Sequence, residues 1–77
     1  MPRFFFDTDD GQTLMKDAYG IELENQDEAC RVAVDTLPDM ARDSLPENEK
    51  RRMAVYVKNE VGEAVLDATL SVQVDWR

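Results

Sequence analysis

The fold is decided by the stretch Leu66-Asp67-Ala68-Thr69-Leu70-Ser71-Val72-Gln73-Val74-Asp75-Trp76. Every second residue of this stretch is apolar, and the residues between them are polar. This period of two predicts a long β-strand with one face buried and the other in water. A slip of one residue would turn the whole apolar set outward, so we expect a firm register. We expect this strand to be central in the sheet, with residues 73–77 as an exposed edge for a second chain if that end outruns its neighbours.

A hairpin precedes this strand. Residues 52–58 also alternate, with Met53, Val55 and Val57 on one face, which predicts another strand. Residues 59–63 contain a glycine that can adopt a positive φ, as a tight hairpin connection requires. The two strands are therefore expected to pair antiparallel.

A second hairpin is predicted at the other end of the chain. Residues 3–8 are rich in strand-forming aromatic residues. The Asp-Gly turn at residues 9–12 predicts a short return strand from residue 13 to residue 16 or 17. Ile21 and Leu23 follow in an alternating pattern, and we expect both side chains to plug the bottom of the core.

One helix is predicted between the two hairpins. Asn25 and Glu28 form a capping box, in which Asn25 accepts from the Glu28 N–H and Glu28 reaches back. An apolar stripe at three- and four-residue spacing follows, made of Ala29, Val32, Ala33, Thr36, Leu37, Met40 and Ala41. Pro38 has no N–H for the helix ladder, so we expect a kink, or a break with Pro38 opening a second segment. The helix should end at residues 45–46, before a solvated loop at residues 47–50.

The order ββαββ predicts an α+β fold with a single domain over residues 1–77. It is a two-layer sandwich, in which one kinked or broken helix covers one face of an antiparallel sheet. The expected core contacts join the helix to both hairpins: Val32, Leu37 and Met40 against Phe4 or Phe6, Val55, Leu70 and Val72. As a buried residue, Leu70 should cost about 2–5 kcal/mol when replaced by alanine.

The composition limits the functional classes. The chain has 77 residues, no histidine and one cysteine, which removes most catalytic arrangements, and we expect no catalytic residue, metal site or cofactor. Its net charge of −8 opposes binding to nucleic acid or anionic lipid, because phosphate contacts need lysine and arginine. A basic protein surface would instead be attracted. The acidic balance can also serve only solubility.

The cysteine count and the chain start indicate a compartment. Cys30 stands alone, so no intramolecular disulfide or four-ligand zinc site is possible within one chain. It lies beside the apolar stripe, and we expect it to be half-buried. No apolar run is long enough for a signal peptide or a membrane span. A reducing cytoplasm is the expected location.

Several segments resemble a known family. They are residues 1–7 with Asp10-Gly11, then Gly20 with Glu22-Leu23, residues 40–43, and Val57 through Gly62 to residues 68–70. Together they are similar to a family of short bacterial proteins from rhizobia and other alphaproteobacteria, grouped as a domain of unknown function. The resemblance spans nearly the whole chain and implies a bacterial cytosolic origin. The family provides no activity or ligand to transfer.

Candidate partner-binding residues come from the distribution of charge and aromatic residues. Residues 1–30 hold eight acidic residues against two basic ones, a net charge of −6. Around the first hairpin and at the helix start lie the acidic candidates Asp7, Asp9, Asp10, Glu24, Asp27 and Glu28. The fold can place both groups along one rim, where a row of carboxylates stands in for a phosphate backbone. Phe5 and Tyr56 are expected on the outer sheet face, either as anchors for a partner or as a local cross-strand pair.

Two functional classes follow from these features. The first is a non-enzymatic acidic protein-interaction module that binds a basic surface of a partner protein, as a nucleic-acid mimic or an inhibitor of the anti-CRISPR kind. The alternative is a small structural or regulatory homodimer that assembles through the sheet. Salt dependence separates them, because an acidic mimic should lose affinity steeply as salt rises while a hydrophobic dimer should not.

Overall fold

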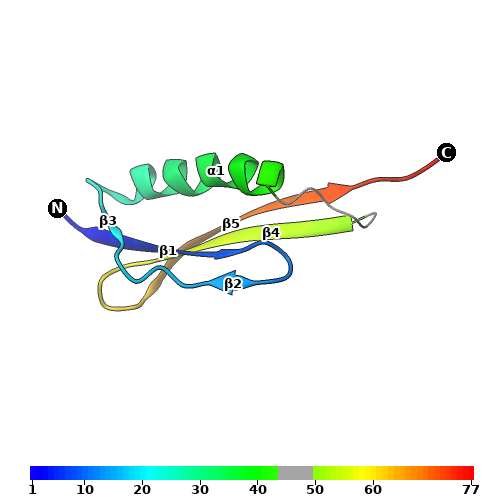
Figure 1. The fold of residues 1–77 in the computed structure, drawn as a ribbon. Helices are drawn as coiled ribbons and strands as arrows, with labels where there is room; N and C mark the ends of the chain where they lie inside the picture. Colours follow the sequence, from blue (N-terminus) through cyan, green and yellow to red (C-terminus); the bar gives the residue numbers. More distant parts are fainter. Residues whose placement is uncertain (44–49) are drawn as a thin grey trace.

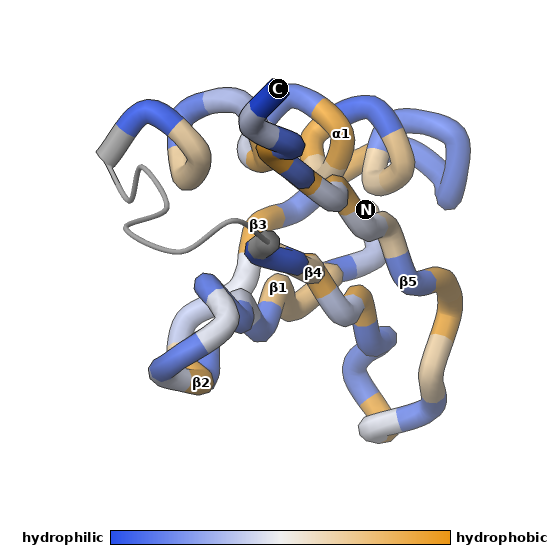
Figure 2. Tube along the Cα trace, turned by 90° about the vertical axis from the view of Figure 1, so that its right-hand side faces the viewer, coloured by the Kyte–Doolittle hydropathy of each residue, from blue (hydrophilic) through white to orange (hydrophobic). Residues whose placement is uncertain are grey.

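The structure is a computed structural model that describes residues 1–43 and 50–77. Its elements are β1 (Arg3–Asp9), β2 (Leu14–Met15), β3 (Ile21–Glu22), α1 (Gln26–Asp43), β4 (Lys50–Lys58) and β5 (Ala64–Gln73). Helix α1 covers one face of an antiparallel sheet (Figure 1), which confirms the two-layer α+β fold. The view along the strands shows the helix as one layer and the sheet as the other (Figure 2). The predicted helix end at residues 45–46 lies outside the described residues, as does the predicted loop up to residue 49.

The strand order corrects one expectation. The sheet runs β2-β1-β4-β5, with β3 also paired to β1, so β4 is central and β5 lies at an edge. The prediction that the last strand is central was wrong. Strict alternation marks a strand that is wet on one face, whereas β4 buries Met53, Val55 and Val57 on the helix side and Ala54 on the other. A strand buried on both faces is the one that belongs between two neighbours.

The segment between β1 and α1 pairs with β1 at two places. Strand β2 joins the far end of β1 over two residues, fewer than predicted, and β3 joins the near end, where Ile21 lies opposite Phe4. Leu23 packs against the core as expected. Ile21 does not, since 44% of it is exposed. Of the two side chains predicted to enter the core, only that of Leu23 therefore does so.

Helix α1 begins as the capping box predicts. The N–H of Glu28 donates to Asn25 Oδ1 (3.0 Å), and the Glu28 carboxylate accepts from the N–H of Glu24 (3.2 Å). The helix continues through Pro38 to Asp43, so the predicted break is absent. Pro38 and Val34, whose carbonyl loses its usual donor, both lie at exposed positions. Over the described residues, no helix combines the length and apolar character needed to cross a membrane.

The core lies between α1 and the facing side of the sheet. Its buried members are Phe4, Ala29, Ala33, Leu37, Met53, Val55 and Val57. The predicted contributors Phe6, Met40, Leu70 and Val72 pack against this cluster while remaining partly exposed. Leu70 is only partly buried because, among the described residues, no strand lies on the outer side of β5. Its replacement by alanine is therefore expected to cost less than a fully buried site would.

Candidate functional site

Asp7 lies inside the fold rather than on its surface. Its side chain is in β1 opposite Tyr56 and is 7% exposed. Its carboxylate pairs with Lys58 Nζ at 2.9 Å and accepts the N–H of Asp17 at 3.0 Å. Burial alone would raise the pKa of Asp7, but the Asp17 N–H and the Lys58 ammonium together lower it. Asp7 therefore stays ionised and stabilises the sheet, and it is not available to a partner.

Asp17 organises the segment that crosses the edge of β1. Its carboxylate accepts from the backbone N–H groups of Phe6 (3.1 Å), Tyr19 (3.0 Å) and Gly20 (3.1 Å). Burial opposes its ionisation, yet these donors and the charge of Arg3 lower its pKa. The sequence analysis placed this residue at the end of a strand and missed the role. The sequence did contain a signal for this role. Asp17 precedes Tyr19 by two residues and Gly20 by three, a spacing that is typical of an Asx turn.

These two aspartates make folding stability depend on pH. Both have a pKa below the ordinary 3.8 in the folded protein, so the unfolded chain binds protons first as the pH falls. Their contribution is complete above the unfolded pKa of about 3.9 and is lost as the pH falls through the lower folded values. We expect the urea midpoint to be steady from about pH 7 to 5 and to drop steeply below about pH 4.

The matched variant for this prediction is Asp17→Asn, which keeps a side-chain acceptor but removes the charge. It should start with a lower midpoint at neutral pH and lose less on acidification than the wild type. A wild-type midpoint that is as high at about pH 2.5 as at pH 7 contradicts the assignment.

Asp9 and Asp10 bind their own turn. Asp9 Oδ1 accepts the Gly11 N–H at 2.9 Å, and Asp10 Oδ1 accepts the N–H groups of Gln12 (2.9 Å) and Thr13 (2.8 Å). The Thr13 and Gln12 donors, helped by the charge of Arg51, lower the pKa of Asp10. The Asp10 carboxylate is therefore charged, and the side chains of both Asp9 and Asp10 hold the hairpin connection in shape.

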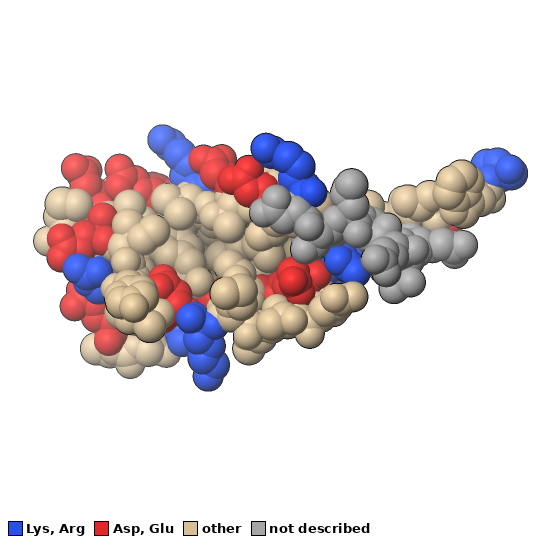
Figure 3. Space-filling view, viewed as in Figure 1, with Lys and Arg blue, Asp and Glu red and all other residues tan. Residues whose placement is uncertain are grey.

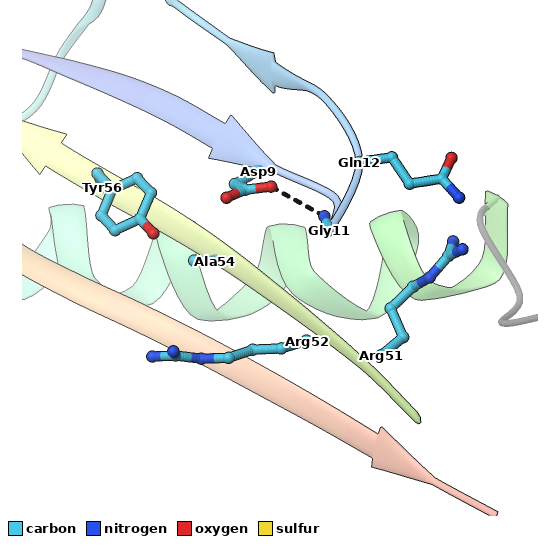
Figure 4. Close-up of a pocket in the computed structure, with 7 residues that line it drawn as sticks. All are labelled: Asp9, Gly11, Gln12, Arg51, Arg52, Ala54 and Tyr56. Atoms are coloured by element: carbon cyan, nitrogen blue, oxygen red, sulfur yellow. Dashed lines mark hydrogen bonds between the residues drawn. The ribbon is translucent and has the colours of Figure 1, made fainter. Parts of the chain in front are cut away.

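A polar pocket of about 320 Å³ lies beside this turn, on the sheet face opposite α1. Its lining consists of Asp9, Gly11, Gln12, Arg51, Arg52, Ala54 and Tyr56 (Figure 4). Arg51 extends on the Gln12 side of the pocket, whereas Arg52 extends in the other direction along the sheet. The two acidic residues of the turn thus lie next to two cations. This end of the sheet has mixed charge rather than an acidic surface.

The predicted aromatic pair shares the face opposite α1. Phe5 lies opposite Lys58, one diagonal step from Tyr56, so both aromatic residues point to the same side of the sheet. Tyr56 is 36% exposed and lines the polar pocket. Phe5 is partly buried, and its ring lies against Gly20. Of these two aromatic residues, Tyr56 is the one that offers an exposed ring on the face opposite α1.

The acidic surface that the structure does assemble lies at the opposite end of β1. Glu24, Asp27 and Glu28 lie at the start of α1, at the end of the molecule that also holds β3 and the β4–β5 turn (Figure 1). The backbone N–H of Arg3 donates to Glu60 of that turn (2.9 Å), which fixes the turn against the start of β1. We call this surface the acidic end; its members are Glu22, Glu24, Asp27, Glu28, Glu60 and Glu63. Figure 3 shows acidic side chains gathered at this end of the molecule.

The two predicted acidic groups are therefore not on one rim. Asp9 is the last paired residue of β1 and Asp10 follows it, whereas the helix start lies at the end of the molecule where β1 begins (Figure 1). The seven residues of β1 span about 20 Å at roughly 3.3 Å per residue. The continuous row of carboxylates that the sequence suggested is absent, because the strand separates its two halves.

One other expectation changes with the structure. Cys30 is exposed rather than half-buried, because it lies one position past the buried Ala29 on the helix surface. Among the described residues, no three acidic or cysteine side chains come together as a metal site would require.

Comparison with known proteins gives one match. A family model described as a domain of unknown function matches residues 3–71, from the first residue of β1 to near the end of β5. No curated protein and no solved structure matches the chain.

Proposed function

The chain belongs to the family with this model, the Domain of unknown function (DUF6894), and from that premise we propose that it is a non-enzymatic module whose acidic end binds a basic surface of a partner protein. The observation that carries the proposal is the joining of three separate chain segments into one acidic surface. Residues from β3, from the start of α1 and from the β4–β5 turn lie at this one end of the molecule, although the turn is more than 30 residues away from the others in sequence. Arg3 joins two of these segments, since it contacts both Glu22 and Glu60. A cytoplasmic, bacterial setting is part of the proposal.

The pattern of ion pairs supports this choice of surface. Elsewhere, Asp7 pairs with Lys58 at 2.9 Å and Asp39 pairs with Arg42 at 2.9 Å. Within the described residues Asp35, Asp67 and Asp75 form no ion pair, but they lie on separate segments of the chain. At the acidic end, Arg3 pairs with Glu22 at 3.0 Å. Within the described residues, the remaining members of this surface form no ion pair, so their field is directed outward. Carboxylates with such a field attract and orient a basic partner.

The rigidity of the acidic end also favours binding. Glu28 is held by the helix cap, Glu60 by the Arg3 N–H, and Glu63 by the side chain of Asn59 (3.2 Å). Groups that are already ordered lose less conformational entropy when a partner binds. Fixed carboxylates can replace phosphates on a partner that binds nucleic acid, so the finer proposal is a nucleic-acid mimic or an inhibitor of such a partner.

A charge-neutralised variant tests the proposal. Glu24→Gln, Asp27→Asn and Glu60→Gln combined keep every acceptor but remove three charges from the acidic end. At about 0.5 kcal/mol for each exposed charge, affinity for the partner should fall about tenfold at low salt, and its salt dependence should flatten. The partner is first isolated from the native host by affinity capture, identified by mass spectrometry and purified for titration.

The matched control removes three charges elsewhere, through Asp9→Asn, Asp35→Asn and Asp67→Asn. It should bind as the wild type does, because these residues lie outside the acidic end. Equal affinity of the wild type and the acidic-end variant at low salt contradicts the proposal, as does an equal loss in the control. Equal affinity would mean that the acidity serves solubility, whereas an equal loss in the control would mean that net charge rather than the acidic end governs binding.

A further inference from the structure

One edge of the sheet is closed and the other is open. At the β1 edge, β3 pairs with Arg3 and Phe4, and β2 pairs with Thr8 and Asp9. Between them, the Phe6 N–H donates to the carboxylate of Asp17 at 3.1 Å. At the other edge, β5 pairs only with β4, and no described strand lies on its outer side. The outer N–H and C=O groups of β5 are thus available to another strand.

Strand β5 has few of the features that usually prevent edge pairing. It runs for ten residues with the sequence AVLDATLSVQ, which contains no lysine, arginine, proline or glycine. Its only charged residue is Asp67, and the one register irregularity in its pairing lies at its start, opposite Val57 and Lys58. Long regular edges without such protection are surfaces for pairing with another chain.

An apolar groove of about 470 Å³ runs beside this edge, between α1 and β5. Its apolar lining includes Cys30, Val34, Pro38, Leu66, Ala68 and Leu70. Val34 is 51% exposed, and Cys30 is exposed as well. The groove therefore places apolar side chains in water next to a row of unpaired backbone groups.

The chain itself carries a segment that matches the groove. After β5, Val74 and Trp76 continue the apolar alternation beyond the last pair with β4, which joins Gln73 to Lys50. Val74 is 38% exposed and Trp76 is 83% exposed. In an extended strand they point to the same side as Leu66, which is the side of the groove. They cannot fill the groove of their own chain, because they lie past the end of the strand that lines it.

We propose that the groove and the open edge bind a second copy of this chain, with the two β5 strands paired antiparallel about a twofold axis at Leu70. In this register Leu66 lies opposite Val74, and the apolar faces of both strands stay on the helix side. Each chain then inserts the end of its apolar alternation into the groove of the other. The inference goes beyond the proposed function, because it does not depend on any partner of the acidic end.

Charge complementarity selects this register. With the axis at Leu70, Arg77 of each copy lies opposite Glu63 of the other. An axis at Thr69 would place Asp75 opposite Glu63, and an axis at Ser71 would place Asp75 opposite Asp67. Like charges directly opposite one another are destabilising in a sheet. An axis at Val72 would leave residues 64–66 without a partner, and an axis at Ala68 would place Val74 opposite Gly62 of the β4–β5 turn. An axis at Leu70 pairs the whole of β5 and keeps Val74 opposite Leu66.

The geometry of the helices allows the assembly. A twofold axis perpendicular to the sheet keeps both copies of α1 on the same face. Each helix packs over β4 and β5, so two strand spacings of roughly 4.8 Å separate the two helix axes, about 10 Å in all. Helices in direct contact lie about 8–10 Å apart. At about 10 Å the two helices do not clash.

Sedimentation equilibrium tests the assembly. The wild type should shift from 8.8 kDa toward twice that mass as its concentration rises to the millimolar range. Val34→Glu places a charge in the groove at an already exposed position, so the fold should persist while dimerisation weakens at least tenfold. Val61→Glu is the matched control on the β4–β5 turn, where valine is 77% exposed, and it should dimerise as the wild type does. A fixed mass of 8.8 kDa up to millimolar protein overturns the proposal and leaves the groove to a peptide of another protein.

Disulfide trapping tests the register. In a Cys30→Ser background, Thr69→Cys protein is mixed with Ser71→Cys protein under mild oxidation. With the axis at Leu70, residue 69 of one copy faces residue 71 of the other at a Cα separation of about 4.5–5.5 Å, which a disulfide can span. Each variant alone places its cysteines on a diagonal of about 7–8 Å or more, so it should cross-link poorly. Cross-linking that is as efficient in either single variant as in the mixture overturns this register.

Discussion

Phe4→Ala is expected to lower the free energy of unfolding by about 3–5 kcal/mol. Phe4 is 4% exposed and belongs to the buried cluster that joins β1 and β4 to α1. Removing its ring loses the transfer free energy of the side chain and leaves a cavity that the paired strand β1 cannot collapse to fill. A 77-residue domain has a total stability of about 4–12 kcal/mol at roughly 0.05–0.15 kcal/mol per residue. The variant should therefore be close to unfolding at room temperature.

Urea denaturation followed by circular dichroism measures this effect. The matched control is Tyr19→Ala, which removes another aromatic ring at a position that is 84% exposed. That change should stay within about 0.5 kcal/mol of the wild type. Similar midpoints for the Phe4 and Tyr19 variants would place the Phe4 ring outside the core.

Gly20→Ala is expected to lower the free energy of unfolding by about 2–5 kcal/mol, from backbone strain and overpacking together. Gly20 has a φ of +73°, and an added Cβ would lie 2.9 Å from the Phe4 carbonyl oxygen and 3.0 Å from the Phe5 ring. The carbonyl belongs to a paired strand, so it cannot move away without disturbing the sheet. The Asp17 turn, which ends at Gly20, should open together with this clash.

Gly62→Ala separates the effect of backbone strain from the effect of overpacking. Gly62 has a φ of +85° in the β4–β5 turn, and an added Cβ would meet no atom within 4 Å. This variant should lose only the cost of a positive φ, about 1–2 kcal/mol. Thermal melts of both variants under the same conditions provide the comparison. Equal losses for Gly20 and Gly62 would mean that the close approach to β1 contributes nothing.

The candidate surface was predictable only in part. Sequence reasoning identified Glu24, Asp27 and Glu28, because a capping box fixes where a helix starts and acidic residues near that point are local information. It did not identify Glu60 and Glu63, since no local sequence pattern shows that the β4–β5 turn lies against the start of β1. It also treated Asp7 as a surface residue. Burial of an acidic residue depends on the cation and the N–H group that meet it, and these come from elsewhere in the chain.

The sequence by itself determined the helix start, the buried face of β4 and the α+β class, because the capping box and the periods of two and 3.6 residues act within one segment. Only the tertiary structure decided which strand is central, which edge is open and which aspartates are internal. A period of two specifies the face that a strand buries, but it does not specify the strand beside it. Because β1 pairs with β4, β5 lies at the edge of the sheet. This one long-range pairing leaves the groove, and Leu70 in its lining, exposed.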